Sequence, residues 1–220
     1  EKKLEGAGLR GQVAGKTSLS TVGKAGKGLT YRGYEIEVLA EKAFFEEVAY
    51  MLLYGNLPNQ EEYSAYSDKL KKLRSLPNEL KEVLENIPAS THPMDVMRTG
   101  CSMLGNLEPE GDFENQNTSA DRILASMASI IVYWYKFSHD GIKVNLETDY
   151  ETIGGHFLSL LTDKEPSEDD IRCLDTSLIL YAEHGFNAST FTARTCASTL
   201  SDIHSCITGA IGTLRGPLHG

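Results

Sequence analysis

The stretch SADRILASMASIIVYWYKF, residues 119–137, contains Trp134, the single tryptophan of the chain. Its apolar side chains recur at helical spacing and occupy more than one face of a helix. A helix with apolar residues on most of its sides has to be covered by other elements on those sides. We therefore expect residues 119–137 to form a helix that is buried on most sides.

Helical patterns also dominate the sequence on both sides of this stretch. An apolar stripe that starts at Phe44 is stopped by Gly55, and Asn59 followed by Glu62 is typical of a capping box. Helices are predicted at residues 44–53, 59–75, 77–88, 152–161, 167–183, 189–198 and 201–214. The residues 92–97 begin a further helix, and residues 108–118 form a loop. Strands do not alternate with helices and no repeat period is visible, so we expect an all-α fold.

The N-terminal residues are extended and rich in turns. Residues 18–22 and 29–31 have strand-forming patterns and flank the glycine-rich stretch 23–28, which predicts a small antiparallel β-hairpin. A glycine-rich loop can hold a phosphate, but no GK[ST] motif on a helix follows it, so we interpret this one as a turn. The sequence thus predicts an N-terminal extended segment with a hairpin, residues 1–34, and a helical large domain, residues 35–220.

Composition excludes several classes of function. The formal net charge of −10 argues against nucleic-acid and membrane-surface binding, which need clustered positive charge. No run of eighteen apolar residues is present to span a membrane, and the charged first residues do not resemble a signal peptide, so we expect a cytoplasmic protein. Cys101, Cys173, Cys196 and Cys206 lack CxxC spacing, and we expect them to be buried, reduced thiols.

Two of the six histidines stand in contexts that favour chemistry. His184 is followed by a glycine, a polar turn and a new helix start, a wall rich in hydrogen-bonding groups. His219 lies in a Gly-Pro-Leu-His-Gly sequence, where proline stiffens the loop. A helix after Gly220 would keep this imidazole neutral and able to donate to an oxygen that gains negative charge. His204 lacks the further ligands that a metal site needs, so no metal is expected.

Several motifs, in the same order along the chain, resemble the citrate synthase family. They are TVGK (21–24), LTYRGYEI (29–36), HPMDVMRTG (92–100), IGGHFL (153–158), YAEHGFNASTFTAR (181–194) and ITGAIGTLRGPLHG (207–220). The resemblance covers essentially the whole chain. It is closest to the 2-methylcitrate synthase branch of the family, which the tyrosine at Tyr181 fits.

The resemblance implies a mostly helical, homodimeric enzyme that joins an acyl-CoA to oxaloacetate in a Claisen condensation. Propionyl-CoA, oxaloacetate and water would give 2-methylcitrate and CoA, with no metal or prosthetic group, because CoA enters as part of the thioester substrate. His219 matches the catalytic histidine that stabilises the enol or enolate of the thioester. His184 and Asn187 match residues that bind oxaloacetate. No cofactor-binding residue is assigned within the chain.

Some positions depart from the family pattern or leave alternatives open. Gly185 stands where relatives commonly carry an acidic residue, which removes a charge next to His184. Arg98, Arg194 and Arg215 are available to bind carboxylates, although pairing within the protein is the favoured role for them. Acetyl-CoA is the first alternative substrate, since one methylene in an apolar pocket discriminates only about 10- to 200-fold. A non-catalytic helical binding module is the alternative of another class.

Family members are markedly longer than this chain. The resemblance implies that the aspartate base, a second histidine that activates the oxaloacetate carbonyl, further substrate arginines and most of the CoA site follow the Gly-Pro-Leu-His-Gly motif. Most of the small domain and the rest of the C-terminal part would then lie outside this sequence. We expect the 220-residue chain alone to lack synthase activity.

Overall fold

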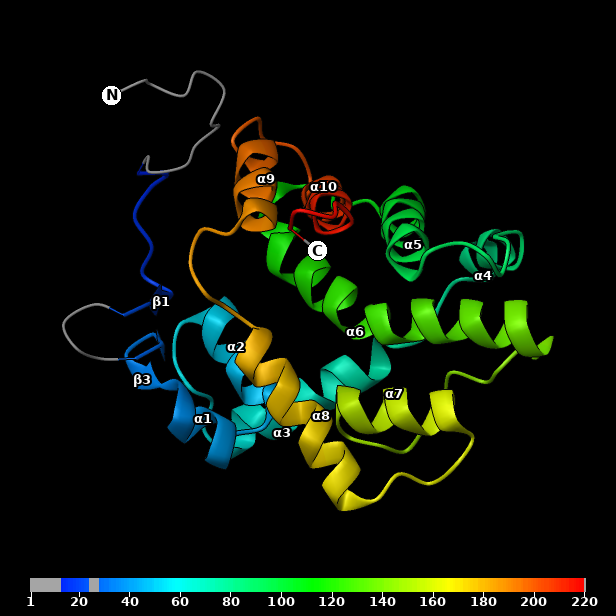
Figure 1. The fold of residues 1–220 in the computed structure, drawn as a ribbon, viewed down its shortest axis with the longest axis horizontal. Helices are drawn as coiled ribbons and strands as arrows, with labels where there is room; N and C mark the ends of the chain where they lie inside the picture. The colour runs from blue at the N-terminus through cyan, green and yellow to red at the C-terminus, as the bar shows by residue number, and fades with distance from the viewer. Residues whose placement is uncertain (1–12, 24–27, 220) are drawn as a thin grey trace.

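The computed structural model describes residues 13–23 and 28–219, and their fold is mostly helical, as expected (Figure 1). Residues 1–12 and 24–27, part of the predicted glycine-rich loop, lie outside the described residues. The helices are α1 (Ile36–Lys42), α2 (Phe45–Tyr54), α3 (Gln60–Lys72), α4 (Asn78–Glu85), α5 (Pro93–Leu107), α6 (Gln116–Tyr135), α7 (Ile153–Thr162), α8 (Glu168–Tyr181), α9 (Ala188–Ala197) and α10 (Ile203–Leu214). A 3-10 helix, η1 (Phe113–Asn115), precedes α6, and a π-helical turn, η2 (Lys136–Asp140), follows it.

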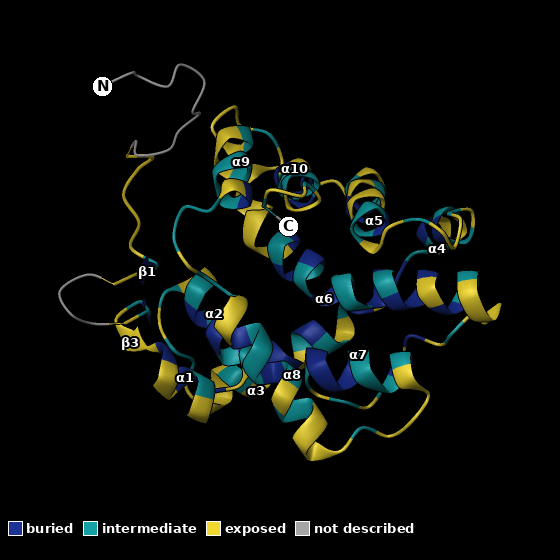
Figure 2. Cartoon of the chain, in the orientation of Figure 1, coloured by how far each residue is buried: buried dark blue, intermediate teal, exposed yellow. Residues whose placement is uncertain are grey.

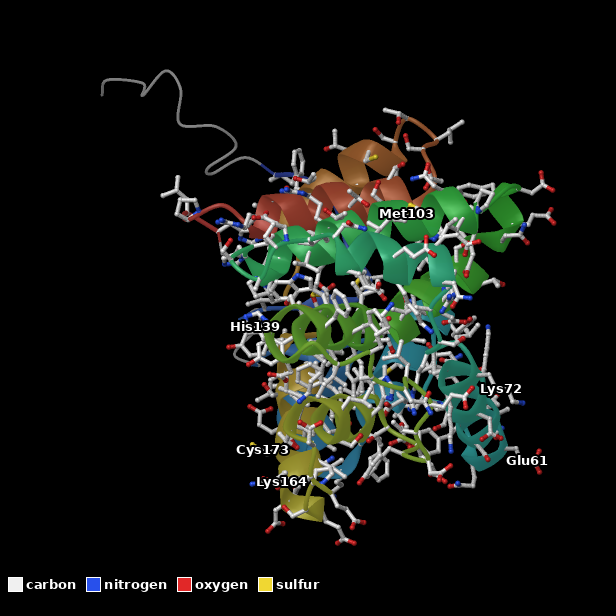
Figure 3. The ribbon with its side chains drawn as sticks, turned by 90° about the vertical axis from the view of Figure 1, so that its right-hand side faces the viewer. Glu61, Lys72, Met103, His139, Lys164 and Cys173 are labelled. Carbon is white, nitrogen blue, oxygen red and sulfur yellow. The ribbon has the colours of Figure 1, made fainter. Side chains whose placement is uncertain are left out.

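Helix α6 runs through the middle of the molecule (Figure 1). It packs against α4, α5 and α10 on one side and against α3 and α7 on the other. In the side view, α9 and α10 lie at the top and α8 at the bottom (Figure 3). Trp134 is buried in this helix, and its indole Nε1–H donates to the carbonyl of Ile87 at 3.2 Å. Figure 2 shows buried residues on the inner faces of α2, α6 and α7, which confirms the expected buried helix.

The predicted hairpin is present as part of a three-stranded antiparallel sheet. Its strands are β1 (Ser20–Thr21), β2 (Thr30–Tyr31) and β3 (Tyr34–Glu35), in the order β1-β2-β3. The third strand was not predicted. It follows a two-residue turn at Arg32 and Gly33, whose φ angles are 47° and 93°. Positive φ at both turn positions matches the right-handed twist of the paired strands, which is why so short a hairpin can form.

Helix boundaries agree with the sequence where caps mark them and differ where caps are weak. The capping boxes at Asn59 and Ser167 are confirmed. Helix α1 was missed, because seven residues are too few to show a clear helical period. The observed loop is shorter than the predicted loop, residues 108–118, because α6 already begins at Gln116.

The four cysteines do not share one environment. Cys101 and Cys206 are buried, as expected. Cys173 on α8 is exposed, and Cys196 on α9 is half-buried, so the expectation of core thiols was wrong for these two. Both lie on helices that have a solvent-facing side, which a local reading of apolar neighbours does not reveal. Within the described residues, no helix combines the length and apolar character needed to cross a bilayer.

Close packing of α5 on α10 leads to a first prediction. A Cβ atom added at Gly105 would lie 2.6 Å from the Cβ of His204 on α10. We expect Gly105→Ala to lower the free energy of unfolding by about 1–3 kcal/mol, because the two helices must separate to relieve the overlap. Urea unfolding followed by circular dichroism measures this.

Gly212 on α10 provides the matched control for this prediction. A Cβ added there would be 3.7 Å from the Cδ of Arg98, an ordinary contact. Gly212→Ala should therefore raise stability by up to about 1 kcal/mol through helix propensity. Equal effects of the two variants would contradict the close approach at Gly105.

Candidate active site

The N-terminal sheet holds the segment between α8 and α9 that carries His184. Tyr31 on β2 is fully buried, and its hydroxyl donates to a backbone carbonyl near the end of α8 at 2.9 Å. The same hydroxyl accepts the N–H of Glu183 at 3.2 Å. The Glu183 carboxylate in turn accepts the Ser20 hydroxyl at 3.0 Å and the N–H of Gly185 at 2.5 Å. The sheet thus fixes the backbone on both sides of His184.

Gly185 has a structural reason to be glycine. Its φ angle is 91°, a backbone conformation that residues with a Cβ rarely adopt. This backbone conformation favours glycine over the acidic residue that relatives commonly carry at this position. This geometry turns the chain from α8 toward the start of α9.

Asn187 caps α9 and contacts His184. The sequence predicted a helix over residues 189–198, whereas α9 begins at Ala188 and Asn187 is its N-cap. Its Oδ1 accepts the N–H of Thr190 at 2.8 Å and the hydroxyl of Ser189 at 2.7 Å. Its Nδ2 lies 3.1 Å from Nε2 of His184. Because an amide NH₂ can only donate, Nε2 of His184 is the acceptor, and a neutral His184 carries its proton on Nδ1.

His219 lies at the same end of α9. Its Nε2 accepts the backbone N–H of Ser189 at 3.2 Å and lies 3.1 Å from the Ser189 hydroxyl. Since a backbone N–H can only donate, Nε2 is the acceptor, and the N–H of a neutral ring then lies on Nδ1. The sequence attributed a neutral ring to a helix after Gly220, which lies outside the described residues. In this structure the N-terminus of α9 instead places a backbone N–H donor against the ring.

The three residues predicted from the sequence therefore belong to one hydrogen-bonded network. It runs from His184 through Asn187 and Ser189 to His219. Ser189 was not predicted as a site residue, although its place two residues after the helix cap puts its N–H at the free N-terminus of α9. A cleft of about 540 Å³ adjoins the network, lined in part by Asn187 and Phe186. That size suits a small-molecule site.

The three arginines considered from the sequence make contacts within the protein. Arg98 pairs with Asp95 at 3.3 Å, and Arg215 pairs with the same carboxylate at 3.2 Å. The guanidinium of Arg194 lies over the ring of Phe186, 4.8 Å from its centre. For Arg98 and Arg215 these contacts are the pairing that the sequence favoured, whereas Arg194 contacts an aromatic ring.

His156, in the IGGHFL motif, is a structural histidine. It is fully buried, with Nε2 2.9 Å from the hydroxyl of Ser129 and Nδ1 3.0 Å from that of Thr148. Burial, together with the positive charge of Arg74, lowers its pKa to about 4. The ring is therefore neutral at pH 7 and joins α6 to α7.

His204 lines a second cavity of about 450 Å³ between α5 and α10. Burial lowers the pKa of His204, although nearby acidic groups such as Asp202 oppose the shift. Among the described residues, no group of three or more His, Cys, Asp or Glu side chains is arranged to hold a metal ion. None of the predicted site residues lines this cavity, so the His184–His219 network is the stronger candidate.

Comparisons with known proteins agree with the motifs. Residues 8–220 match the family model described as citrate synthase, C-terminal domain. The 2-methylcitrate synthase of Shewanella oneidensis is 67% identical over 219 residues, covering 100% of this chain and 58% of that protein. The citrate synthase of Deinococcus radiodurans is 37% identical, covering 97% of this chain and 57% of that protein.

Solved structures agree with the fold. Citrate synthase from Pyrobaculum aerophilum superimposes with a TM-score of 0.88 at 34% identity, covering 97% of this chain and 56% of that one. A ternary complex of citrate synthase from Thermoplasma acidophilum with carboxymethyl coenzyme A and oxaloacetate gives a TM-score of 0.85 at 27% identity, covering 93% and 54%. The chain therefore spans little more than half the length of the relatives it matches. With its family model, relatives and fold in agreement, this chain belongs to the citrate synthase family.

Proposed function

We propose that this chain is the helical part of a 2-methylcitrate synthase, which condenses propionyl-CoA with oxaloacetate and water to give 2-methylcitrate and CoA. The observation that carries the proposal is the 67% identity to the Shewanella oneidensis enzyme of that name along the whole chain. The network at the start of α9 supports it, because it joins two imidazoles that can donate N–H hydrogen bonds, through Asn187, to a cleft that Asn187 lines.

The chemistry explains why such donors are needed. A proton next to a thioester carbonyl is very weakly acidic, so a carboxylate base alone removes it too slowly. The Nδ1–H of His219 is suited to donate to the thioester oxygen as negative charge develops there. The Nδ1–H of His184 is suited to donate to oxaloacetate. The family resemblance assigns the base itself to the region after Gly220.

The choice between propionyl-CoA and acetyl-CoA is tested with the complete enzyme. Relatives named citrate synthase make acetyl-CoA the second candidate. We expect kcat/KM to be higher for propionyl-CoA, by no more than about 200-fold, because the two substrates differ by one methylene. A clear preference for acetyl-CoA would instead identify a citrate synthase. No activity with either thioester would support a binding module.

Binding of oxaloacetate provides a further prediction. At a concentration about 100 times its Kd, oxaloacetate should stabilise the complete protein by about 2.7 kcal/mol, which raises Tm by several degrees. We expect His184→Ala to lose most of this shift, because a donor to the substrate and the partner of Asn187 are both removed. Differential scanning fluorimetry with and without oxaloacetate measures it.

His139→Ala is the control for this experiment, because His139 is an exposed residue on η2, visible at the surface in Figure 3. Its Tm shift should equal that of the wild-type protein. If His184→Ala kept the full shift, His184 would not bind oxaloacetate.

The resemblance also supports a homodimer as the working form of the enzyme. Light scattering of the complete protein should give a molar mass twice that of one chain. A mass equal to one chain at micromolar concentration would contradict the dimer.

A further inference from the structure

Helices α9 and α10 pack against each other in opposite directions, and their side chains set the register between them. The hydroxyl of Thr213 on α10 donates to that of Thr192 on α9 at 2.8 Å. A Cβ added at Gly209, one turn before Thr213, would lie 3.5 Å from the methyl group of Thr192. Thr192 therefore faces the stretch of α10 between Gly209 and Thr213.

The same register brings two cysteines together. Cys196 follows Thr192 by one helical turn and lies on the same face of α9. In an antiparallel pair, one turn forward on α9 corresponds to one turn back on α10. Position 196 therefore faces residues 205–209, and Cys206 lies in that range on the face of Gly209.

The surroundings of the thiols agree with this placement. Cys206 is buried, and its Sγ lies 3.8 Å from the carbonyl of Ser201. Burial raises the pKa of the Cys206 thiol to about 11, and interaction with the Cys196 thiol contributes to the rise. Cys196 is half-buried and is the more accessible of the two.

We propose that Cys196 and Cys206 form a dithiol site that a small disulfide, such as oxidised glutathione, converts to an intramolecular disulfide. The Cys196 thiolate attacks one sulfur of the reagent, which releases one glutathione thiolate and leaves a mixed disulfide on Cys196. The Cys206 thiol loses its proton to solvent and attacks the Cys196 sulfur, which releases the second glutathione. Two protein thiols are oxidised, and one glutathione disulfide is reduced to two thiols.

The disulfide would link the last turn of α9 to the first turn of α10. Between the two helices lies a short loop in which Leu200 is exposed and has a positive φ of 63°. The network of Asn187, Ser189 and His219 lies at the other end of α9, so the disulfide would not cover or block this network. By restricting the unfolded loop, the disulfide is expected to raise the Tm by about 5 °C. The proposal does not depend on the catalytic function.

Mass spectrometry tests the site on the complete protein. Both cysteines fall in one tryptic peptide, residues 195–215, because no lysine or arginine lies between Arg194 and Arg215. After incubation with oxidised glutathione and blocking of free thiols, we expect this peptide to be lighter than its reduced form by two hydrogen atoms and to carry no blocking group. Its formation should accompany the rise in Tm.

Three serine variants serve as controls. Cys206→Ser should keep glutathione on Cys196, and Cys196→Ser should show neither the linked peptide nor the Tm shift. Cys173→Ser should form the link normally, since Cys173 lies on α8, at the opposite end of the molecule in Figure 3 from α9 and α10. In the wild-type protein, modification of Cys173 by glutathione shows that the reagent is active.

Two results in the wild-type protein would overturn the proposal. In one, Cys173 carries glutathione while Cys196 and Cys206 stay free. In the other, Cys196 keeps glutathione and does not form a disulfide with Cys206.

Discussion

Replacement of His219 by alanine is expected to lower kcat of the complete enzyme by about 10²–10³-fold, equal to about 3–4 kcal/mol of lost transition-state stabilisation. The Nε2 of His219 accepts the N–H of Ser189, which leaves Nδ1 as the ring nitrogen that can donate. In the proposed reaction its Nδ1–H is the donor, and its hydrogen bond would strengthen as the thioester oxygen gains charge. Such a donor acts mainly in the transition state, so kcat and kcat/KM should fall together while KM changes little.

Steady-state kinetics with propionyl-CoA and oxaloacetate measures this effect. His219→Gln keeps a neutral N–H donor and should lose less activity than His219→Ala. His139→Ala, at an exposed position, should behave as the wild-type enzyme does. Circular dichroism shows whether each variant is folded. A folded His219→Ala enzyme with kcat within about threefold of wild type would remove His219 from the catalytic step.

Much of the fold could be predicted because its signals are local. The apolar pattern around Trp134 predicts a buried helix, and the capping boxes at Asn59 and Ser167 mark helix starts within four residues of sequence. Helix α1 and strand β3 were missed for a related reason. Each is short, and each is stabilised by packing against α8 or by pairing with β2 rather than by its own pattern.

The site could be predicted only in part. The motifs singled out His184, Asn187 and His219, and the structure joins them. The joining residue, Ser189, was missed because its contact with His219 spans 30 residues of chain. That contact exists only because α9 and α10 pack together. The supporting contact between Glu183 and Ser20 spans 163 residues and has no local signal.

The burial of one carboxyl group also could not be predicted from local sequence, and it leads to the second large prediction. Glu46 and Glu47 lie in the first turn of α2, where acidic side chains are usually exposed to solvent. It is in fact buried, and its Oε1 accepts the N–H of Ile153 at 2.7 Å. Its Oε2 has no hydrogen-bond partner among the described residues. Burial raises the pKa of Glu46 from 4.5 to about 7, and the nearby charge of Asp175 adds to the rise.

This raised pKa sets the sign of a pH effect on stability. The folded state holds the proton of Glu46 more tightly than the unfolded state does, so the contribution is fully present below pH 4.5 and is lost as pH rises through about 7. The loss amounts to about 3 kcal/mol for a shift of this size. Glu46→Gln mimics the protonated form, and we expect it to be more stable than wild type by about 3 kcal/mol at pH 8, with the difference vanishing near pH 4.

Urea unfolding of both proteins between pH 4 and pH 8 measures the difference, and His156 does not disturb it. The lowered pKa of His156 makes both proteins less stable as pH falls from 6.5 through about 4, so that dependence cancels when one curve is subtracted from the other. Glu41→Gln, at an exposed position of α1, is the matched control and should show no pH-dependent difference. A constant gap between Glu46→Gln and wild type across this range would mean that the pKa of Glu46 is the same in the folded and unfolded protein, and a gap that shrinks as pH rises would mean that Arg74 keeps Glu46 ionised in the folded protein; either result contradicts the prediction.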